Sequence, residues 1–489
     1  MLRRSLLAGL PLILACVSSL QAQDNTATPS EVNPPQTTES APATKDKDWE
    51  AMGLSLRAVT IDSIGMTLHL PLDCDVKVEP LSDRRLAAEP KDKTWKMSVD
   101  IQRARDDEAT AESLARGYGV KAATNTKTLK QNPPVPVTIN GYAASQIVLQ
   151  IPNAKDRADT WMHTVFNPAP RVFVVFSLEC TSQGTDEPVR LYRAALESIS
   201  FLEPAKIAAD RALAETAAEA TFAALSESAI RGMLVEDRWY RVYSIEKDGK
   251  ERQLAYYRVR ESMGPRGEVN PDRSPAQYDP AERDEGVTVR LDARYLQTAG
   301  SVYDVQSISW SSFDRTQETW SVRSAMNLKL ESGAFAAPQV SSLTGNTIGE
   351  LIDLVISDPG ATPKRLTMKK PEKAYLPQAF RSFMYRAFKP YDAAAYGMLT
   401  FEPSVGKITY RVETIAPATE KDATADAAGA KWVVRSRLTA DSPENTLLLD
   451  EAGNILKITK PNGEVTVASS LPEIKRIWSE QNLPTGSLR

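Results

Sequence analysis

Histidine is the side chain best suited to proton transfer near neutral pH, and the chain contains only two, His69 and His163. Their spacing excludes a zinc site of the His-Glu-x-x-His type. A Ser-His-Asp triad would have to use one of them, and the sequence has no Gly-x-Ser-x-Gly motif. His69 lies on the polar side of an alternating segment, and His163 lies among aromatic residues. We therefore expect one solvated and one packed histidine, neither of them catalytic.

Thiol chemistry is limited to three cysteines, of which Cys16 lies in the N-terminal apolar run. Cys74 and Cys180 fall on the apolar side of alternating segments, which predicts that both are buried. They can form a disulfide only if their Cα atoms lie within ~7 Å, and otherwise they are two free thiols. A redox role has no support, because the sequence contains no Cys-x-x-Cys motif.

Carboxylates and phosphate-binding motifs give no stronger evidence for a catalytic or binding site than the histidines and cysteines do. Asp73 and Asp75 could share a calcium ion, but calcium prefers about six to eight oxygens from a compact loop, so a solvated strand face is the simpler interpretation. Glycine-rich phosphate motifs are absent. Ser-x-x-Lys occurs at residues 244–247 and 404–407 without the companion motifs of penicillin-recognising enzymes. We predict no catalytic residue, no cofactor and no metal.

Large apolar residues are the remaining candidate for a site. A helix predicted to start at Pro377 places four of them on one face, and two tryptophans lie in strands nearby in the sequence. The set could line an apolar cavity that accepts a lipid or peptide, or it could simply fill a core. It consists of Phe380, Phe383, Met384, Phe388, Trp310 and Trp320. The polar segment 263–286 would be a mobile lid over such a cavity.

The first 22 residues have the organisation of an export signal. Arg3 and Arg4 precede an apolar run that is shorter than the ~20 residues needed to span a bilayer, and a small residue, Ala22, precedes the predicted cleavage point. We therefore expect a periplasmic or extracellular protein. Alternatively, Cys16 and the residues before it roughly fit a lipobox, and a lipid there would anchor the chain to the envelope.

Composition also limits the possible partners. The chain has 59 basic and 63 acidic side chains, a formal charge of −4, which argues against nucleic-acid binding. Residues 23–48 are rich in proline, threonine and serine, and we predict a disordered tether there. Contact with a membrane is expected only through a lipid anchor. The expected partner is a protein or an apolar small molecule.

Residues 49–203 form a first predicted domain, with alternating strands, two helices and a hairpin turn at Asn140-Gly141. The segments GMTLHLPLDCDVKV, WKMSVDI, VTINGYAASQIVLQI and RVFVVFSLEC occur in an order that resembles the PsbP-like family. The resemblance implies an α/β/α sandwich with an antiparallel sheet. It also implies a relation to extrinsic photosynthetic proteins and to secreted or lipid-anchored bacterial proteins. It assigns no functional residue.

Residues 204–231 are rich in alanine and predict a long connecting helix. Residues 234–482 predict a second domain of antiparallel strands with helices, and residues 483–489 a tail. The strand-turn-strand segment LLLDEAGNILKITKPNG resembles the ending of LolA-like half-barrels. That family carries or senses lipids and lipoproteins at the bacterial envelope, so the resemblance implies a curved sheet that holds an apolar ligand.

The sequence as a whole predicts the α+β fold class, with two antiparallel-sheet domains joined by the alanine-rich helix. The predicted function is that of a non-catalytic, exported envelope protein that binds a protein partner or an apolar ligand. Two alternatives stay open. One is a purely structural module of a cell-surface assembly. The other is a hydrolase that uses two carboxylates facing each other across a cleft.

Overall fold

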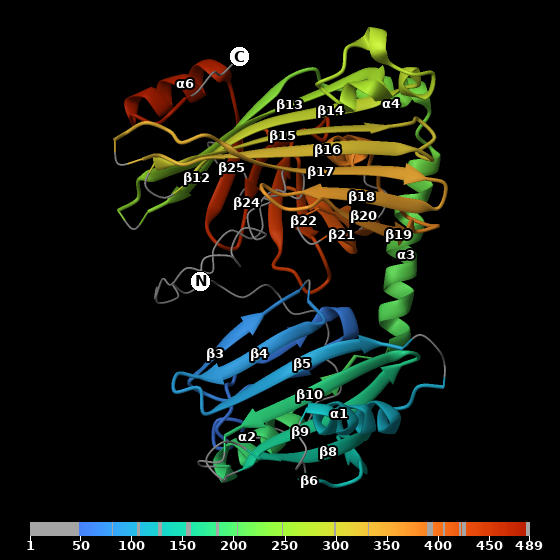
Figure 1. Cartoon of the computed structure of the whole chain (residues 1–489), viewed down its shortest axis with the longest axis vertical. Helices are drawn as coiled ribbons and strands as arrows, with labels where there is room; N and C mark the ends of the chain where they lie inside the picture. The colour runs from blue at the N-terminus through green and yellow to red at the C-terminus, as the bar shows by residue number, and fades with distance from the viewer. Residues whose placement is uncertain are drawn as a thin grey trace. The chain divides into compact units, whose positions relative to one another are not determined.

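A computed structural model describes the chain from residue 48 to residue 485. The gaps are residues 81, 105–107, 126–129, 153–157, 182–184, 203, 247, 298–299, 331, 389–394, 404–405, 420–421 and 423–426. The predicted signal, Cys16 and nearly all of the predicted tether lie outside the described residues. The chain forms two compact units (Figure 1). The N-terminal unit contains the described residues up to Arg211 and the segment Thr439–Ser442, and the C-terminal unit contains the rest.

The N-terminal unit is built on one antiparallel sheet with the spatial order β3-β4-β5-β10-β9-β8-β6, in which β7 also pairs with β8. Its strands are β3 (Cys74–Val78), β4 (Arg84–Pro90), β5 (Trp95–Arg103), β6 (Lys130–Gln131), β7 (Val135–Ile139), β8 (Tyr142–Pro152), β9 (Ala158–Ala169) and β10 (Val172–Cys180). The hairpin expected at Asn140-Gly141 joins β7 to β8, and both turn residues have positive φ. The turn therefore needs residues that tolerate the left-handed region.

Helices cover both faces of this sheet, because alternate residues of its central strands are apolar on both sides. Phe173 and Val175 of β10 face α1 (Ala111–Asn125), whereas Val174 and Phe176 face α2 (Asp186–Glu197). Tyr192 of α2 is fully buried, stacks on Phe176 and donates to its carbonyl at 2.8 Å. The result is the α/β/α arrangement that the PsbP-like resemblance implies (Figure 1).

The long alternating segment expected from Met66 to Val78 is divided between two sheets. β2 (Met66–Leu68) pairs with β1 (Val59–Ile61) and β11 (Ser200–Phe201) in a small sheet, and β3 belongs to the large one. The interruption falls at Pro71 and at Asp73, which has a φ of 57°. A proline without an N–H and a left-handed residue cannot continue a strand.

The predicted connecting helix is two helices. α3 (Pro204–Ala223) carries the chain from one unit to the other, and α4 (Glu227–Met233) begins anew after Ser226, whose hydroxyl accepts from the amide of Ala229 at 3.2 Å. Ala218 and Phe222 near the end of α3 are buried in the core of the C-terminal unit. A serine cap explains why the helical segment is divided at this point.

The C-terminal unit contains one antiparallel sheet of 14 strands, in the order β19-β18-β17-β16-β15-β14-β13-β12-β25-β24-β23-β22-β21-β20. Their bounds are β12 (Arg238–Ile245), β13 (Glu251–Pro265), β14 (Glu285–Leu296), β15 (Val302–Ser311), β16 (Glu318–Asn327), β17 (Gln339–Ile348), β18 (Leu351–Ser357), β19 (Lys364–Lys369), β20 (Ala395–Glu402), β21 (Lys407–Pro417), β22 (Trp432–Arg437), β23 (Asn445–Leu449), β24 (Ile455–Thr459) and β25 (Glu464–Ser469). Each paired strand is a neighbour in sequence, except that β12 pairs with β25, and β19 and β20 form the two ends of the sheet.

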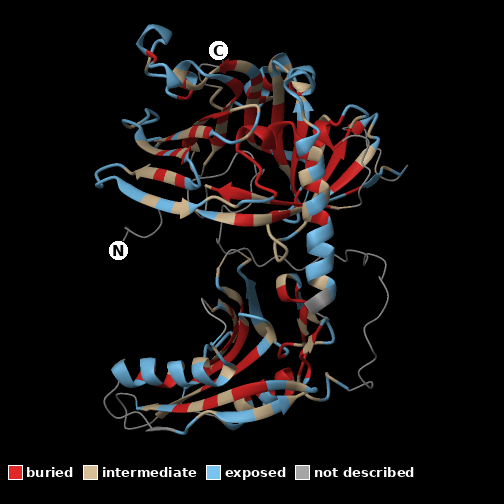
Figure 2. Ribbon diagram, turned by 90° about the vertical axis from the view of Figure 1, so that its right-hand side faces the viewer, coloured by how far each residue is buried: buried red, intermediate tan, exposed pale blue. Residues whose placement is uncertain are grey.

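The sheet is curved, and its inner face forms the main core. Along β14, Val287, Val289 and Leu291 are buried in this core, while the alternate residues Arg290 and Asp292 lie on the outer face. This matches the alternation expected from the sequence. In Figure 2 the buried residues of the C-terminal unit gather along the strands and in the space that they enclose.

Residues Ala374–Phe388, here called the inner segment, fill this space. They contain η7 (Ala379–Ser382) and the short helix α5 (Met384–Ala387) in place of the single helix expected from Pro377, because Phe383 leaves helical geometry. Before η7, Leu376 donates to the carbonyl of Leu399 at 2.8 Å, and Leu399 donates to that of Ala374 at 2.8 Å. The inner segment therefore covers the free edge of β20.

The last helix, α6 (Leu471–Glu480), packs on the outer face. The hydroxyl of Ser470 caps it by accepting from the amide of Glu473 at 3.3 Å. Ile474 and Trp478, which are fully buried, pack on Tyr256. The spacing of these two residues by one helical turn is the amphipathic pattern that predicts this helix from the sequence.

Close packing at Gly345 gives a first prediction. A Cβ atom there would lie 2.1 Å from Cζ2 of Trp320, a ring that is 1% exposed and cannot move away. Gly345→Ala should therefore lower the free energy of unfolding by about 1–3 kcal/mol, as overpacking does. Urea denaturation followed by tryptophan fluorescence measures this value. Gly232→Ala in α4 is the control, because a Cβ there meets nothing within 4 Å. An equal effect of both variants would contradict the prediction.

Candidate functional site

The six residues predicted to line an apolar cavity belong to three separate clusters. Phe380, Phe383, Met384 and Phe388 are at most 2% exposed and pack in the main core. Trp310 packs with Val269 on the outer face, and Trp320 packs with Phe401 in another cluster. Trp310 pairs with Thr319 and Ser309 with Trp320, so the two tryptophans point to opposite faces of the sheet. The six residues therefore do not line one pocket.

Buried ion pairs hold the inner segment against the sheet. Arg386 donates to both carboxylate oxygens of Glu261, at 2.7 and 2.6 Å, and the two side chains are 5% and 0% exposed. Arg238 and Ser382 also contact this carboxylate, and the amide of Val235 donates to it at 2.9 Å. Glu261 thus joins the inner segment to β12, β13 and the turn before them. A charge that has several partners can be buried, whereas an unpaired one cannot.

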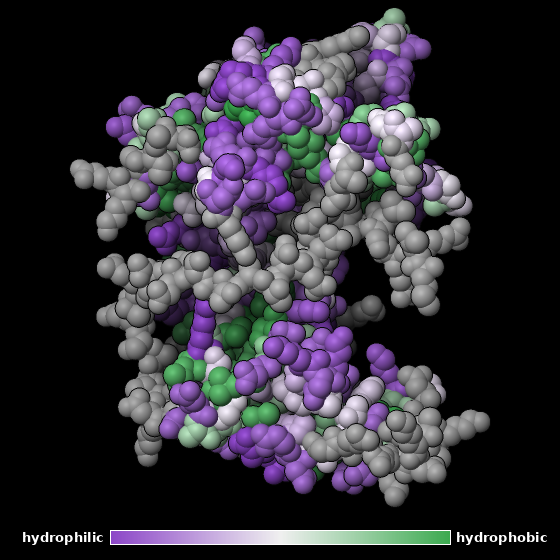
Figure 3. Space-filling model, turned by 90° about the vertical axis from the view of Figure 1, so that its left-hand side faces the viewer, coloured by the Kyte–Doolittle hydropathy of each residue, from purple (hydrophilic) through white to green (hydrophobic). Residues whose placement is uncertain are grey.

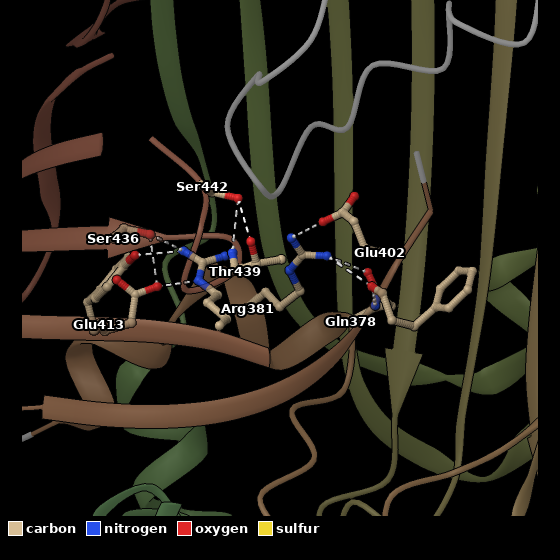
Figure 4. A network of polar contacts seen from close by, with 10 residues as sticks. Gln378, Arg381, Glu402, Glu413, Ser436, Thr439 and Ser442 are labelled. Carbon is tan, nitrogen blue, oxygen red and sulfur yellow. Dashed lines mark hydrogen bonds and ion pairs between the residues drawn. The ribbon is translucent and has the colours of Figure 1, made fainter. Parts of the chain in front are cut away.

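Two further buried ion pairs lie in the same space, and one of them also joins the inner segment to the sheet (Figure 4). Arg381 lies between Gln378 and Glu402, at 3.1 and 3.5 Å, and is 1% exposed. Glu413 receives bonds from Arg411 and, at 3.0 Å, from Ser436. Burial raises the pKa of Glu413, and Arg411 and Ser436 act in the opposite direction. The interior is thus occupied by protein side chains, among them these paired arginines and glutamates.

A single carboxylate also positions the start of the inner segment. Glu318 is 1% exposed, contacts the hydroxyl of Tyr375 and accepts from the amide of Gln378 at 2.9 Å. Its burial raises its pKa above the ordinary range for a glutamate. Sequence reasoning missed this residue, because a lone glutamate at the start of a strand has no distinctive spacing.

The predicted lid, residues 263–286, is folded against the sheet. It contains the end of β13, η3 (Arg266–Val269), η4 (Pro275–Gln277) and η5 (Ala281–Arg283). Ser274 and Gln277 form a capping box, the amide of Glu282 donates to Asp279 at 2.9 Å, and Tyr278 is 6% exposed. The many Pro, Gly and Asp residues that suggested a loose loop here are used in tight turns and caps.

This ordered segment and the outer face of the sheet enclose a polar groove of about 740 Å³. One wall is residues 266–282, and the floor is formed by outward side chains of β15 to β18. This space, here called the polar groove, is lined by residues of the segment 266–282 and of β15 to β18. They are Arg266, Gly267, Val269, Asn270, Pro271, Asp272, Asp279, Ala281, Glu282, Gln306, Ile308, Thr319, Trp320, Ser321, Arg323, Val340, Ser342, Thr344, Gly345, Asn346, Ile348, Asp353 and Val355. A space of this size matches known ligand sites.

The floor combines hydroxyl, amide and charged side chains with apolar ones such as Ile308, Val340 and Val355. Register places Ser321 opposite Thr344 and Arg323 opposite Ser342, so polar side chains form adjacent rows across β16 and β17. Arg266 donates to Asn346 at 2.6 Å and lies over the ring of Trp310 at 5.7 Å, and it joins the wall to the floor. Such a lining suits a ligand that forms hydrogen bonds, and an acyl chain would leave these groups unpaired.

The two cysteines do not bond to each other, so the structure contains the free thiols and not the disulfide, which was the other alternative. Both thiols are free, and each donates to a carbonyl: Cys74 to Pro71 at 3.1 Å and Cys180 to Thr160 at 3.4 Å. β4 and β5 lie between their strands, so three strand spacings of ~4.8 Å separate them, well beyond the ~7 Å limit. Burial raises the pKa of both thiols, which makes them poor nucleophiles.

His163 and Ser177 form a pair that resembles a catalytic base and nucleophile, but a substrate cannot reach it. His163 Nδ1 lies 2.8 Å from the hydroxyl of Ser177, and the residues are 4% and 3% exposed beneath α1. Burial lowers the pKa of His163 to about 4, helped by the charge of Arg84. His69 is also engaged, through Ser55 O at 2.8 Å and a stacked Trp49. Neither histidine is placed for catalysis.

No metal-binding cluster of His, Cys, Asp and Glu is present among the described residues. Asp73 and Asp75, the candidate calcium ligands, lie at the start of β3 without a third acidic neighbour suited to such a site. The Ser-x-x-Lys matches fall partly outside the described residues, at Lys247 and Ser404. In the described part of the chain, no helix is both long and apolar enough to cross a bilayer.

The buried histidine gives a second prediction. The pKa of His163 in the folded protein, about 4, lies below the ordinary ~6.5, so the unfolded chain binds the proton first as the pH falls. The stabilisation is complete above pH ~6.5 and is lost as the pH falls toward ~4, with roughly 2 kcal/mol lost between about pH 7 and pH 5. Urea unfolding at the two pH values measures the loss.

The control uses the only other histidine. His163→Gln should remove this part of the pH dependence, and His69→Gln should retain it. Proton NMR of the two imidazoles gives the pKa directly, with the His163 signal assigned by its absence in the variant. A His163 pKa at or above ~6 would contradict the prediction.

The comparisons with known proteins find similarity to solved structures over part of the chain. No protein-family model matches the sequence, and no curated protein matches it. Among solved structures, the chain is similar to the cyanobacterial PsbP of Synechocystis, with 10% identity, a TM-score of 0.26, and coverage of 30% of this chain and 92% of that one. It is also similar to a beta-barrel-like protein of a domain of unknown function from Brucella abortus, with 10% identity, a TM-score of 0.30, and coverage of 48% and 97%. PsbP is the family that the sequence of the N-terminal domain resembles.

Proposed function

We propose that the chain is a non-catalytic, exported envelope protein that binds a polypeptide partner in the polar groove of its C-terminal unit. The observation that carries this proposal is the contrast between the two faces of the large sheet. The inner face is packed with the inner segment and its ion pairs. The outer face holds a groove of about 740 Å³ in which hydroxyl, amide and charged groups lie among apolar side chains.

The chemistry of the groove favours a polypeptide over the apolar ligand that the LolA-like resemblance implies. A polypeptide backbone carries a donor and an acceptor on nearly every residue, and rows of Ser, Thr and Asn side chains can satisfy both. An acyl chain would instead require an apolar lining. On the face drawn in Figure 3, hydrophilic side chains cover most of the described surface, and hydrophobic ones form small groups.

The non-catalytic part of the proposal rests on how the candidate chemical groups are used. The two histidines and the two described cysteines are engaged in local hydrogen bonds within the N-terminal unit. The buried glutamates of the C-terminal unit are paired with arginine or lysine or hydrogen-bonded to the inner segment. A catalytic group needs access to a substrate, and His163, Cys180 and the paired glutamates are buried.

Site-specific photo-crosslinking in the native host tests the groove. A photoreactive amino acid at Thr344 in the groove should form an adduct with one discrete polypeptide, and Ser342→Trp, which fills the floor, should lower the yield about tenfold. The same amino acid at Thr414, an exposed threonine on the outer face of β21, is the matched control and should give no adduct. Equal adducts at both positions, or a lipid adduct at Thr344, would refute the proposal.

The export part has its own test. The N-terminus of the mature protein, recovered by osmotic shock, should begin at Gln23, because cleavage is expected after Ala22. Cys16→Ala should not change this result. If the chain is instead lipid-anchored, the mature N-terminus will be Cys16, labelled palmitate will be incorporated, and Cys16→Ala will abolish the label. Recovery of the full-length chain from the cytoplasm would show that export is wrong.

A further inference from the structure

The large sheet of the N-terminal unit ends at β3, and among the described residues no strand lies on its outer side. The opposite end of the sheet is protected, because β6 has only two residues and β7 contains Pro136. β3 has five residues, of which the last four are exposed. A strand of this length at a sheet edge presents unpaired backbone groups that another strand can use.

The hydrogen-bond pattern shows which backbone groups point outward. The amide of Glu79, just after β3, donates to the carbonyl of Arg85 at 2.9 Å, and the register continues without a shift through β3. In an antiparallel pair, bonded and non-bonded residues alternate, so Asp75 and Lys77 bond to β4. Val76 and Val78 therefore direct their N–H and C=O groups away from β4.

The side chains of β3 define two different faces for an added strand. On one face, Val76 and Val78 are 43% and 49% exposed, and Leu72 before them is 43% exposed. On the other face, Asp75, Lys77 and Glu79 line a groove of about 540 Å³ that continues over β4 and β5. A strand beside β3 would place alternate side chains against these two faces.

The charges of this second face are not balanced internally. Its lining contains five carboxylates and three basic groups: Asp75, Glu79, Asp83, Glu89 and Asp100, with Lys77, Arg84 and Lys96. Arg84 pairs with Asp100 at 3.1 Å, whereas Asp75 lies opposite another carboxylate, Glu89, on β4. In the described part of the chain, neither of these two acids has an ion-pair partner. Like charges directly opposite each other destabilise a sheet, and a cation placed between them would relieve this.

From these observations we infer that β3 accepts an extended polypeptide segment in which aliphatic residues alternate with lysine or arginine. The backbone of the segment would pair with Val76 and Val78, its aliphatic side chains would cover the exposed valines, and its basic side chains would face Asp75, Glu79 and Glu89. This is β-strand addition, in which the main chain supplies affinity and alternate side chains supply specificity. The site lies on a different unit from the polar groove and does not depend on it.

The experiment uses the mature full chain and two synthetic peptides of roughly eight residues, one alternating valine with lysine and the other valine with glutamate. The lysine peptide should bind at least about tenfold more tightly than the glutamate peptide, and added salt should weaken it. Hydrogen exchange should slow at the amides of Val76 and Val78 when the lysine peptide binds. Equal binding of the two peptides, or no protection at β3, would overturn the inference.

Two matched variants connect the binding to this edge. Val78→Lys places a charge on the apolar face of β3 and should weaken the lysine peptide about tenfold. Val135→Lys, at a similarly exposed valine (53%) on β7 of the same sheet, should leave the affinity unchanged. Ser342→Trp in the polar groove should also leave it unchanged, so this result is independent of the proposed function. Concentration-dependent dimers with protected β3 amides in the absence of peptide would instead identify a second copy as the occupant, and the inference would be wrong.

Discussion

The bidentate pair between Arg386 and Glu261 is the contact on which the C-terminal unit depends most. Both side chains are almost completely buried, so each would carry a large desolvation cost without the other. The pair can form only when the inner segment lies inside the curved sheet, next to β13. The same condition applies to Arg381 with Glu402 and to Glu318 with the start of η7. The buried charges thus define one position for the inner segment, and that position fills the space where an apolar ligand was expected.

Much of the fold could be predicted from residue alternation. The strands around Trp95–Arg103, Val172–Cys180 and Glu285–Leu296 occur where period-two patterns place them, and the Asn-Gly and Asp-Gly turns join the expected hairpins. Alternation is local, however, and does not state which strands become neighbours. It could not show that fourteen strands form one sheet, or that β12 pairs with β25.

The candidate sites were harder to predict, for the same physical reason. Trp310 and Trp320 are both large and apolar, but only the pairing of β15 with β16 reveals that they point to opposite faces. Cys74 and Cys180 both face inward, but only the strand order shows that two strands separate them. The polar groove is formed by short side chains from four strands, whose residue types resemble those of any solvated face. Which residues line the groove depends on how the strands pair, and a single sequence does not reveal that pairing.

The pairing of β12 with β25 has a consequence for the timing of folding. β12 is the first strand of the C-terminal unit and β25 is the last, so nearly the whole unit lies between them in the chain. Contacts between segments so far apart in the chain form late and slow the folding of the unit. Until β25 arrives, one side of β12 stays open to other strands. The unit therefore completes its sheet only after β25 has left the ribosome or, in an exported chain, the translocation channel.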